Sequence, residues 1–258
     1  MIRSDSGPVI TKEKAYRYYV GETDLSDPFF SDPKAYVTLN ALLFEGITTE
    51  TARIRENRKL DPVFLIEMDK TARLLKELDS LIRTHGHPKS DRTVWRVERL
   101  EDYAVMKRTG ILQSFLSTSK NGFLDSYTDK IGLVLMTFHL KNDDPYIDAA
   151  EELSPYPKPE EAEITLPPFI RADFIERDPN EEEAAIRDRD GKKPAVICDV
   201  FLKRETEVFA DAGHISDEDI HRSVRLYDSM NRGEGILPDD LKSYLKVKAY
   251  IRAQMGTQ

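Results

Sequence analysis

The chain has 258 residues, with 38 Lys and Arg against 47 Asp and Glu, a formal net charge of −9 and 40 % hydrophobic residues. This composition is typical of a soluble globular protein with one core of about 150 to 180 residues and flanking helices, and the negative charge makes nucleic-acid binding unlikely, since that requires clustered Lys and Arg. No apolar run is long enough to span a membrane, and the amino terminus lacks the apolar middle of a secretory signal. We therefore expect a cytoplasmic protein, or one exported without a cleavable signal peptide.

Helices are predicted in the first ninety residues. N-cap residues, early prolines and terminal glycines indicate three helices, over about residues 31–46, 48–58 and 61–86. Because these helices have apolar faces, they need a partner surface on which to pack.

Strands are predicted after residue 90. Segments rich in β-branched and aromatic residues indicate six of them, over residues 93–99, 114–118, 131–140, 162–167, 172–177 and 195–203. The charged stretches 141–161 and 177–194 are expected to be mobile loops. Helices followed by strands favour an α+β fold with an antiparallel or mixed sheet.

The end of the chain is again predicted to be helical, over about residues 216–230 and 237–255. We therefore divide the chain into an amino-terminal helical part (1–90), a β core (91–205) and a carboxy-terminal helical extension (206–258).

Two glutamates mark the start of one predicted strand. Glu161 and Glu163 are two residues apart, so in a strand their carboxylates would lie side by side on one face. Like charges at this separation disfavour joint ionisation, which makes the pair a candidate site. The alternative is an acidic loop that leads into a strand.

Three short motifs follow one another in a distinctive order. An aromatic residue precedes Arg96, an F-x-STS segment spans Phe115 to Ser119, and an E-x-E motif ends at Glu163. In this order and strand context the chain, over about residues 93–203, resembles the Arg-Ser-Glu (R-S-E) class of mono-ADP-ribosyltransferases. The resemblance implies two small mixed or antiparallel sheets around a NAD cleft, with amino-terminal helices and a carboxy-terminal helical extension.

The resemblance also implies a role for each motif. Cleavage of the bond between nicotinamide and ribose creates an oxocarbenium-like centre, which needs a held pyrophosphate and a nearby negative charge. Arg96 would bind a phosphate with a planar pair of donors. Glu163 would bond the ribose and stabilise the cation, Ser117 would position Glu163, and Glu161 implies arginine as the acceptor. The remaining expected NAD-binding residues are Thr118, Ser119 and Phe123, with a core or turn aromatic as the alternative for Phe123.

Two departures from the family pattern leave alternatives open. Val97 follows Arg96 where many members have Gly, and a shifted register would make Arg92 or Arg99 the phosphate ligand instead. Residues 167–169, Pro-Pro-Phe, stand where the family often has a Gly-containing turn.

The expected function is transfer of ADP-ribose from NAD to a protein acceptor, on arginine, with release of nicotinamide. The resemblance implies NAD as the substrate, no metal, and an effector-like or toxin-like role. A NAD glycohydrolase is the alternative enzyme. The alternative from a different class is an inactive relative that binds a partner through the same cleft.

Other candidate sites are weaker. Cys198, the single cysteine, lies in an apolar strand-like run and is expected to be a core residue rather than a nucleophile. His85 and His87 are interpreted as a helix stop. The segment 228–241 fails as a calcium loop because Met230 and Arg232 occupy ligand positions.

The last predicted helix carries a basic face, which we expect to be exposed to solvent, with a membrane or partner contact as the alternative. Its residues are Lys242, Lys246, Lys248 and Arg252.

Overall fold

The computed structural model describes residues 11–20, 40, 43, 74–84, 90–123, 132–152, 162–203, 215–231, 234–235 and 237–254. The first predicted helices therefore lie outside the described residues, apart from Asn40, Leu43 and the helical residues 74–84. No helix within these ranges is long and apolar enough to cross a membrane.

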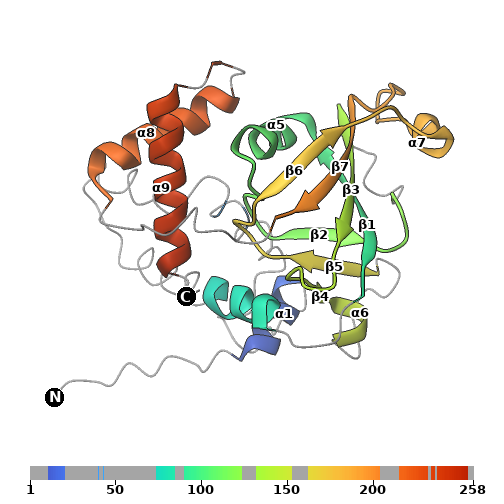
Figure 1. Cartoon of the computed structure of the whole chain (residues 1–258), viewed down its shortest axis with the longest axis horizontal. Helices are drawn as coiled ribbons and strands as arrows, with labels where there is room; N and C mark the ends of the chain where they lie inside the picture. Colours follow the sequence, from blue (N-terminus) through green and yellow to red (C-terminus); the bar gives the residue numbers. More distant parts are fainter. Residues whose placement is uncertain are drawn as a thin grey trace.

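Seven strands form one mixed sheet in the order β4-β5-β2-β1-β3-β7-β6 (Figure 1). They are β1 (Arg92–Arg99), β2 (Leu116–Ser119), β3 (Leu133–Leu140), β4 (Ile147–Asp148), β5 (Glu163–Leu166), β6 (Ala172–Glu176) and β7 (Val196–Leu202). Neighbouring strands pair antiparallel except β3 and β7, which are parallel. The α+β fold and the six predicted strands are confirmed, and β4, with two residues, was not predicted.

The sheet bends sharply between β1 and β2. These strands share one register pair, Trp95 with Ser119, whereas β1 and β3 are paired along all eight residues of each strand. In Figure 1, β2 and β5 run nearly crosswise to β1 and β3. We expected two small sheets, but the described strands form a single sheet whose two parts are joined at Trp95 and Ser119.

Helix α5 (Leu100–Thr109) follows β1 directly and packs Tyr103 and Met106 into the core of the sheet. Its acidic first turn and basic last turn complement the helix dipole, and Gly110 ends it in the left-handed conformation at φ 65°. Helix α5 was not predicted, although these signals are present in the sequence.

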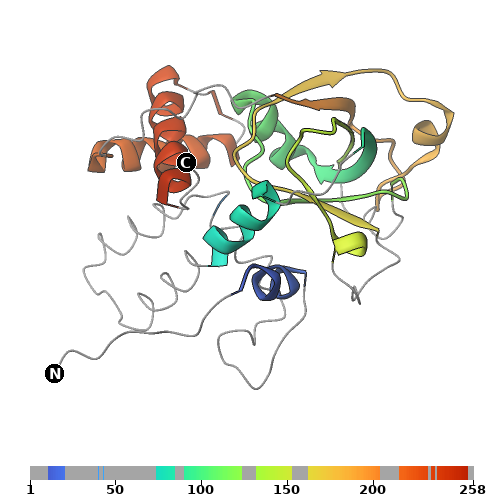
Figure 2. The same ribbon diagram turned by 60° about the horizontal axis from the view of Figure 1, so that its bottom comes forward.

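A second apolar cluster lies where helices cover the β2 and β5 end of the sheet. Its residues come from α1 (Lys12–Tyr19) and from the helical residues 74–84. Phe115, just before β2, and Val247, in the carboxy-terminal helix, also belong to it. Figure 2 shows α1 beside the helix over residues 74–84. Helix α1, which begins at the N-cap Thr11, was not predicted.

Both charged stretches contain short helices where we expected loops. Residues 141–152 include β4 and α6 (Ala149–Glu152), and residues 177–194 include α7 (Glu181–Ala185). Asn180 and Glu183 form a capping box at the start of α7.

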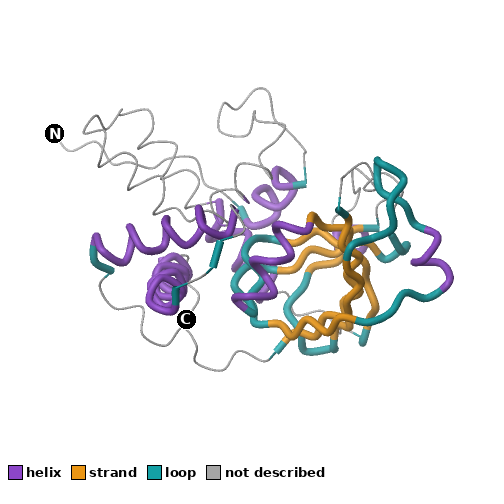
Figure 3. Tube along the Cα trace, turned by 90° about the horizontal axis from the view of Figure 1, so that it is seen from above, coloured by secondary structure: helices purple, strands orange, loops and turns teal. Residues whose placement is uncertain are grey.

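The predicted carboxy-terminal helices are α8 (Asp217–Asn231) and α9 (Pro238–Gln254), which pack crosswise on one another beside the sheet (Figure 3). The expected solvent-facing basic side of α9 is wrong at Lys248. This side chain is fully buried, donates to the Leu43 carbonyl and lies over the rings of Phe169 and Tyr244. A hydrogen bond to a carbonyl and two aromatic faces make burial of the lysine tolerable.

Candidate active site

The centre of the site is a hydrogen bond across β2 and β5. Ser117 is paired with Thr165 and Ser119 with Glu163, so Ser117 and Glu163 are diagonal neighbours on one face. The Ser117 hydroxyl donates to Glu163 Oε1 at 2.6 Å, and the Thr165 hydroxyl donates to the same oxygen at 2.9 Å. With Glu163 only 6 % exposed, the two hydroxyl groups compensate for burial of its carboxylate.

Two buried tyrosines of α1 extend this polar cluster. The Tyr16 hydroxyl lies 2.7 Å from the Thr165 hydroxyl and donates to it, because Thr165 directs its own proton to Glu163. Burial and the negative charge of Glu163 raise the pKa of Tyr19 to about 12, so its phenol stays protonated. Asn40 donates to the Tyr19 hydroxyl at 3.2 Å. Sequence reasoning missed both tyrosines; the only signal was the cluster of tyrosines in α1.

Arg96 lies where β1 and β2 part. Its Nε donates to Glu98 at 2.7 Å and a terminal nitrogen donates to the Ser117 carbonyl at 2.7 Å. Burial opposes the guanidinium charge, but the carboxylate of Glu98 outweighs it, so the pKa of Arg96 is raised and the group stays charged. Ser117 thus contacts Arg96 through its backbone and Glu163 through its side chain.

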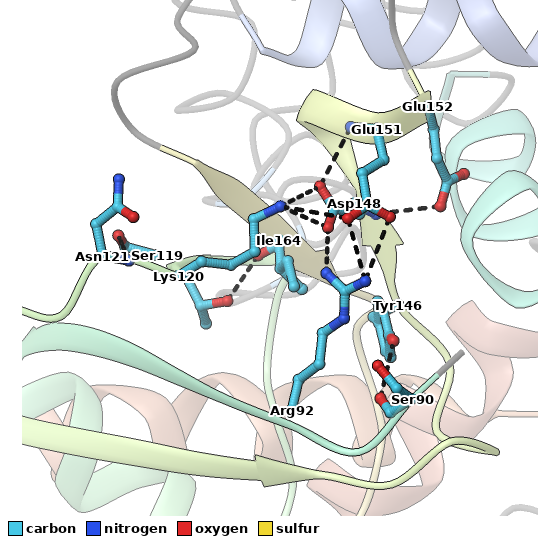
Figure 4. Close-up of polar contacts among 11 residues, drawn as sticks. Ser90, Arg92, Ser119, Lys120, Asn121, Tyr146, Asp148, Glu151, Glu152 and Ile164 are labelled. Carbon is cyan, nitrogen blue, oxygen red and sulfur yellow. Dashed lines mark hydrogen bonds and ion pairs between the residues drawn. The ribbon is translucent and has the colours of Figure 1, made fainter. Parts of the chain in front are cut away.

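The other two arginines of β1 make different contacts. Arg92 pairs with Asp148 and with Glu151 at 3.2 Å, and its guanidinium lies over the Tyr146 ring at 5.9 Å (Figure 4). The Arg99 backbone N–H donates to Glu98 at 3.0 Å. Among the described contacts, therefore, it is Arg96 that reaches the serine motif.

A charge cluster around the buried Asp148 adjoins the site at the end of β2. Asp148 accepts both from Arg92 and from Lys120, whose Nζ lies 2.7 and 2.9 Å from its two oxygens (Figure 4). The Lys120 backbone N–H donates to the Ala162 carbonyl at 3.1 Å. Ala162 has a φ of 44°, a left-handed conformation that is costly for alanine, immediately before Glu163. Lys120 thus links the start of β5 to the charge cluster, through its backbone N–H to Ala162 and through its side chain to Asp148.

The other predicted site residues that the structure describes make contacts of their own. The Thr118 hydroxyl donates to the Ile164 carbonyl at 2.8 Å, and the Ser119 hydroxyl accepts from the Asn121 backbone at 3.0 Å. Phe123 packs against an apolar cluster that includes Val97. Glu161 lies outside the described residues. The structure thus brings Arg96, Ser117 and Glu163 together.

Cys198 is a buried core residue, as predicted. Burial raises the pKa of its thiol to about 12, so it is not a thiolate nucleophile. Within the described ranges, no group of three or more His, Cys, Asp or Glu side chains is arranged to hold a metal ion.

Comparison with solved structures finds similarity to catalytic domains of bacterial proteins. The catalytic domain of VahC from Aeromonas hydrophila is 16 % identical, over 76 % of this chain and 100 % of that one, with a TM-score of 0.47. The Salmonella SpvB ATR domain is 17 % identical, over 75 % of this chain and 98 % of that one, with a TM-score of 0.44.

BECa, an ADP-ribosylating toxin of a C. perfringens binary enterotoxin solved with NADH, is 12 % identical, over 75 % of this chain and 44 % of that one, with a TM-score of 0.44. No protein-family model and no curated protein matches the chain.

From the charge cluster around Asp148 we predict that Asp148→Asn lowers the stability of the protein. The substitution removes the carboxylate that Arg92 and Lys120 share, and hydrogen bonds between charged groups are each worth about 1.5 to 3 kcal/mol. We expect urea denaturation to show a loss of that order in the free energy of unfolding. The control is Asp91→Asn, which changes an exposed pair with Lys141 at 3.5 Å and should cost less than about 1 kcal/mol. Equal effects of the two substitutions would contradict this account.

Because the pKa of Asp102, in the first turn of α5, is raised, we predict that the stability of the protein depends on pH. Burial and the negative charge of Glu98 raise its pKa from 3.8 to about 6. The folded state therefore binds more protons than the unfolded state, and stability is lost as the pH rises through this window. Asp102→Asn should increase the free energy of unfolding at pH 7 by on the order of 2 kcal/mol. Parallel stability curves for the variant and the wild type between pH 4 and 7 would contradict the assignment.

Proposed function

We propose that this protein is a mono-ADP-ribosyltransferase that cleaves NAD at the bond between nicotinamide and ribose and transfers ADP-ribose to an arginine of a protein acceptor. The observation that carries the proposal is the hydrogen bond of 2.6 Å between Ser117 and Glu163, with Arg96 donating to the carbonyl of the same serine. These are the residues that the motif resemblance singled out, and they come from three different strands.

Each side chain has a chemical task in this reaction. Glu163 bonds the ribose hydroxyl and places negative charge beside the oxocarbenium-like carbon as nicotinamide leaves with the bonding electron pair. Ser117 and Thr165 hold one carboxylate oxygen, so Glu163 is oriented before NAD binds. Arg96 binds a phosphate, which suits its planar set of donors.

We assign to Glu161 the activation of the acceptor arginine. A guanidinium nitrogen of the acceptor attacks the ribose carbon and must lose a proton, and a carboxylate two residues before Glu163 is a suitable base. The attack forms one carbon–nitrogen bond as the bond to nicotinamide breaks. If water attacks instead, the product is free ADP-ribose and the enzyme is a NAD glycohydrolase.

Glu163→Gln tests the proposal directly. The amide keeps the size of the side chain but removes the charge that stabilises the cation, so nicotinamide release should fall by about 100-fold or more. Release is measured with purified protein, with and without a cell lysate, and peptide mass spectrometry locates the ADP-ribose. The matched control is Glu182→Gln, an exposed acid of α7. Wild-type protein that releases no nicotinamide under any condition would overturn the proposal.

Glu161→Gln separates the two enzymatic outcomes. Loss of ADP-ribosylated arginine peptides with retained NAD cleavage would support the acceptor role of Glu161. Free ADP-ribose as the sole product of the wild type would instead identify a glycohydrolase.

A further inference from the structure

We propose that Glu98 is a positioning residue that holds the Arg96 guanidinium in the orientation needed to receive a NAD phosphate. This role rests on the proposed function. Neither the motifs nor their order in the sequence pointed to Glu98, which stands two residues after Arg96 on β1.

The contacts fix the guanidinium from one side. One oxygen of Glu98 accepts from Arg96 Nε at 2.7 Å and pairs with the terminal nitrogen Nη2 at 2.6 Å. The other terminal nitrogen, Nη1, donates to the Ser117 carbonyl at 2.7 Å. These contacts use three of the five N–H groups of an arginine and leave one on each terminal nitrogen. Such a pair of donors is what a bidentate phosphate contact requires.

Glu98 is itself held rigidly. Its second oxygen accepts the Arg99 backbone N–H at 3.0 Å, at the junction between β1 and α5. The side chain of Glu98 is 7 % exposed, whereas that of Arg96 is 24 % exposed. The carboxylate is therefore an inner anchor, and the guanidinium is the part that a ligand can approach. A pre-oriented arginine loses less side-chain entropy when it binds a phosphate.

Asp102 lies within electrostatic range of Glu98. Asp102 follows in the first turn of α5, and after burial the largest contribution to its raised pKa is the charge of Glu98. Arg96, Arg99 and Glu101 also act on Asp102, the two arginines lowering its pKa and the acid raising it. Asp102 therefore provides a probe of the charge on Glu98.

The test is the kinetics of nicotinamide release by wild-type protein and Glu98→Gln across a range of NAD concentrations. Loss of the anchor should raise KM for NAD about tenfold and change kcat by less than about threefold, because the chemistry at Glu163 is untouched. Glu98→Asp keeps the charge but withdraws it by one methylene, so its KM should lie between the two. The control is Glu101→Gln, which removes an exposed acid three residues further on and should leave both constants unchanged.

The pKa of Asp102 is a second readout, and it depends on the charge of the side chain at position 98. In Glu98→Gln the pKa of Asp102, followed by NMR titration, should fall from about 6 toward its ordinary value. An unchanged Asp102 pKa would overturn the anchor role, and so would an unchanged or lower KM for NAD in both Glu98 variants.

Arg96→Lys separates failure of this inference from failure of the proposed function. If Arg96→Lys raises KM and the Glu98 variants do not, the function stands and the role of Glu98 is wrong. If the wild type does not cleave NAD, the function fails and the role of Glu98 fails with it.

Discussion

Burial of the Glu163 carboxylate is the constraint on which the rest of the site depends. A buried charge is tolerated only where hydrogen bonds replace water, and here the hydroxyl groups of Ser117 and Thr165 converge on one of its oxygens. The contact from Ser117 requires the register in which Ser119 faces Glu163, whereas Thr165 lies on the same strand as Glu163. A slip of one residue would turn the carboxylate into the apolar cluster around Ile164, so the hydrophobic pattern of β5 also protects the site.

The bend between β1 and β2 explains why polar side chains gather beside this carboxylate. Beyond the pair of Trp95 and Ser119 the two strands no longer pair, which frees the Ser117 carbonyl from β1. The guanidinium of Arg96 takes the place of a strand partner by donating to that carbonyl. The guanidinium therefore completes the backbone hydrogen bonding where β1 and β2 separate, and it stays partly exposed there.

Helices from both ends of the chain hold the two site strands in place. Helix α1 brings Tyr16 to Thr165, and α9 brings Tyr244, which donates to Gln113 at 2.6 Å just before β2. Lys248 of α9 lies over the ring of Phe169, in the turn after β5. Elements separated by more than a hundred residues thus meet on the segments that carry Ser117 and Glu163, and the carboxy-terminal helices are part of the support of the site.

Local patterns were enough to predict much of this architecture. The β-branched and aromatic runs identified β1, β3 and β7, because such residues favour strands. The helix α5 was missed although its dipole-matched turns and Gly110 stop are readable, and β4 was missed because two residues carry no periodic signal. The burial of Lys248 could not be predicted from its residue type, because lysine side chains are mostly exposed. Only the residues packed around a lysine decide whether it can be buried.

The candidate residues and their order along the chain could be read from local motifs, because Arg96, Ser117 and Glu163 lie on strands that can be recognised from composition. Tertiary structure alone decided that Arg96, and not Arg92, contacts Ser117, and that Tyr19 of α1 adjoins Glu163. The physical reason is that these contacts depend on where the sheet bends and on which helix covers it. Both are set by packing between residues far apart in the chain, which a local pattern does not encode.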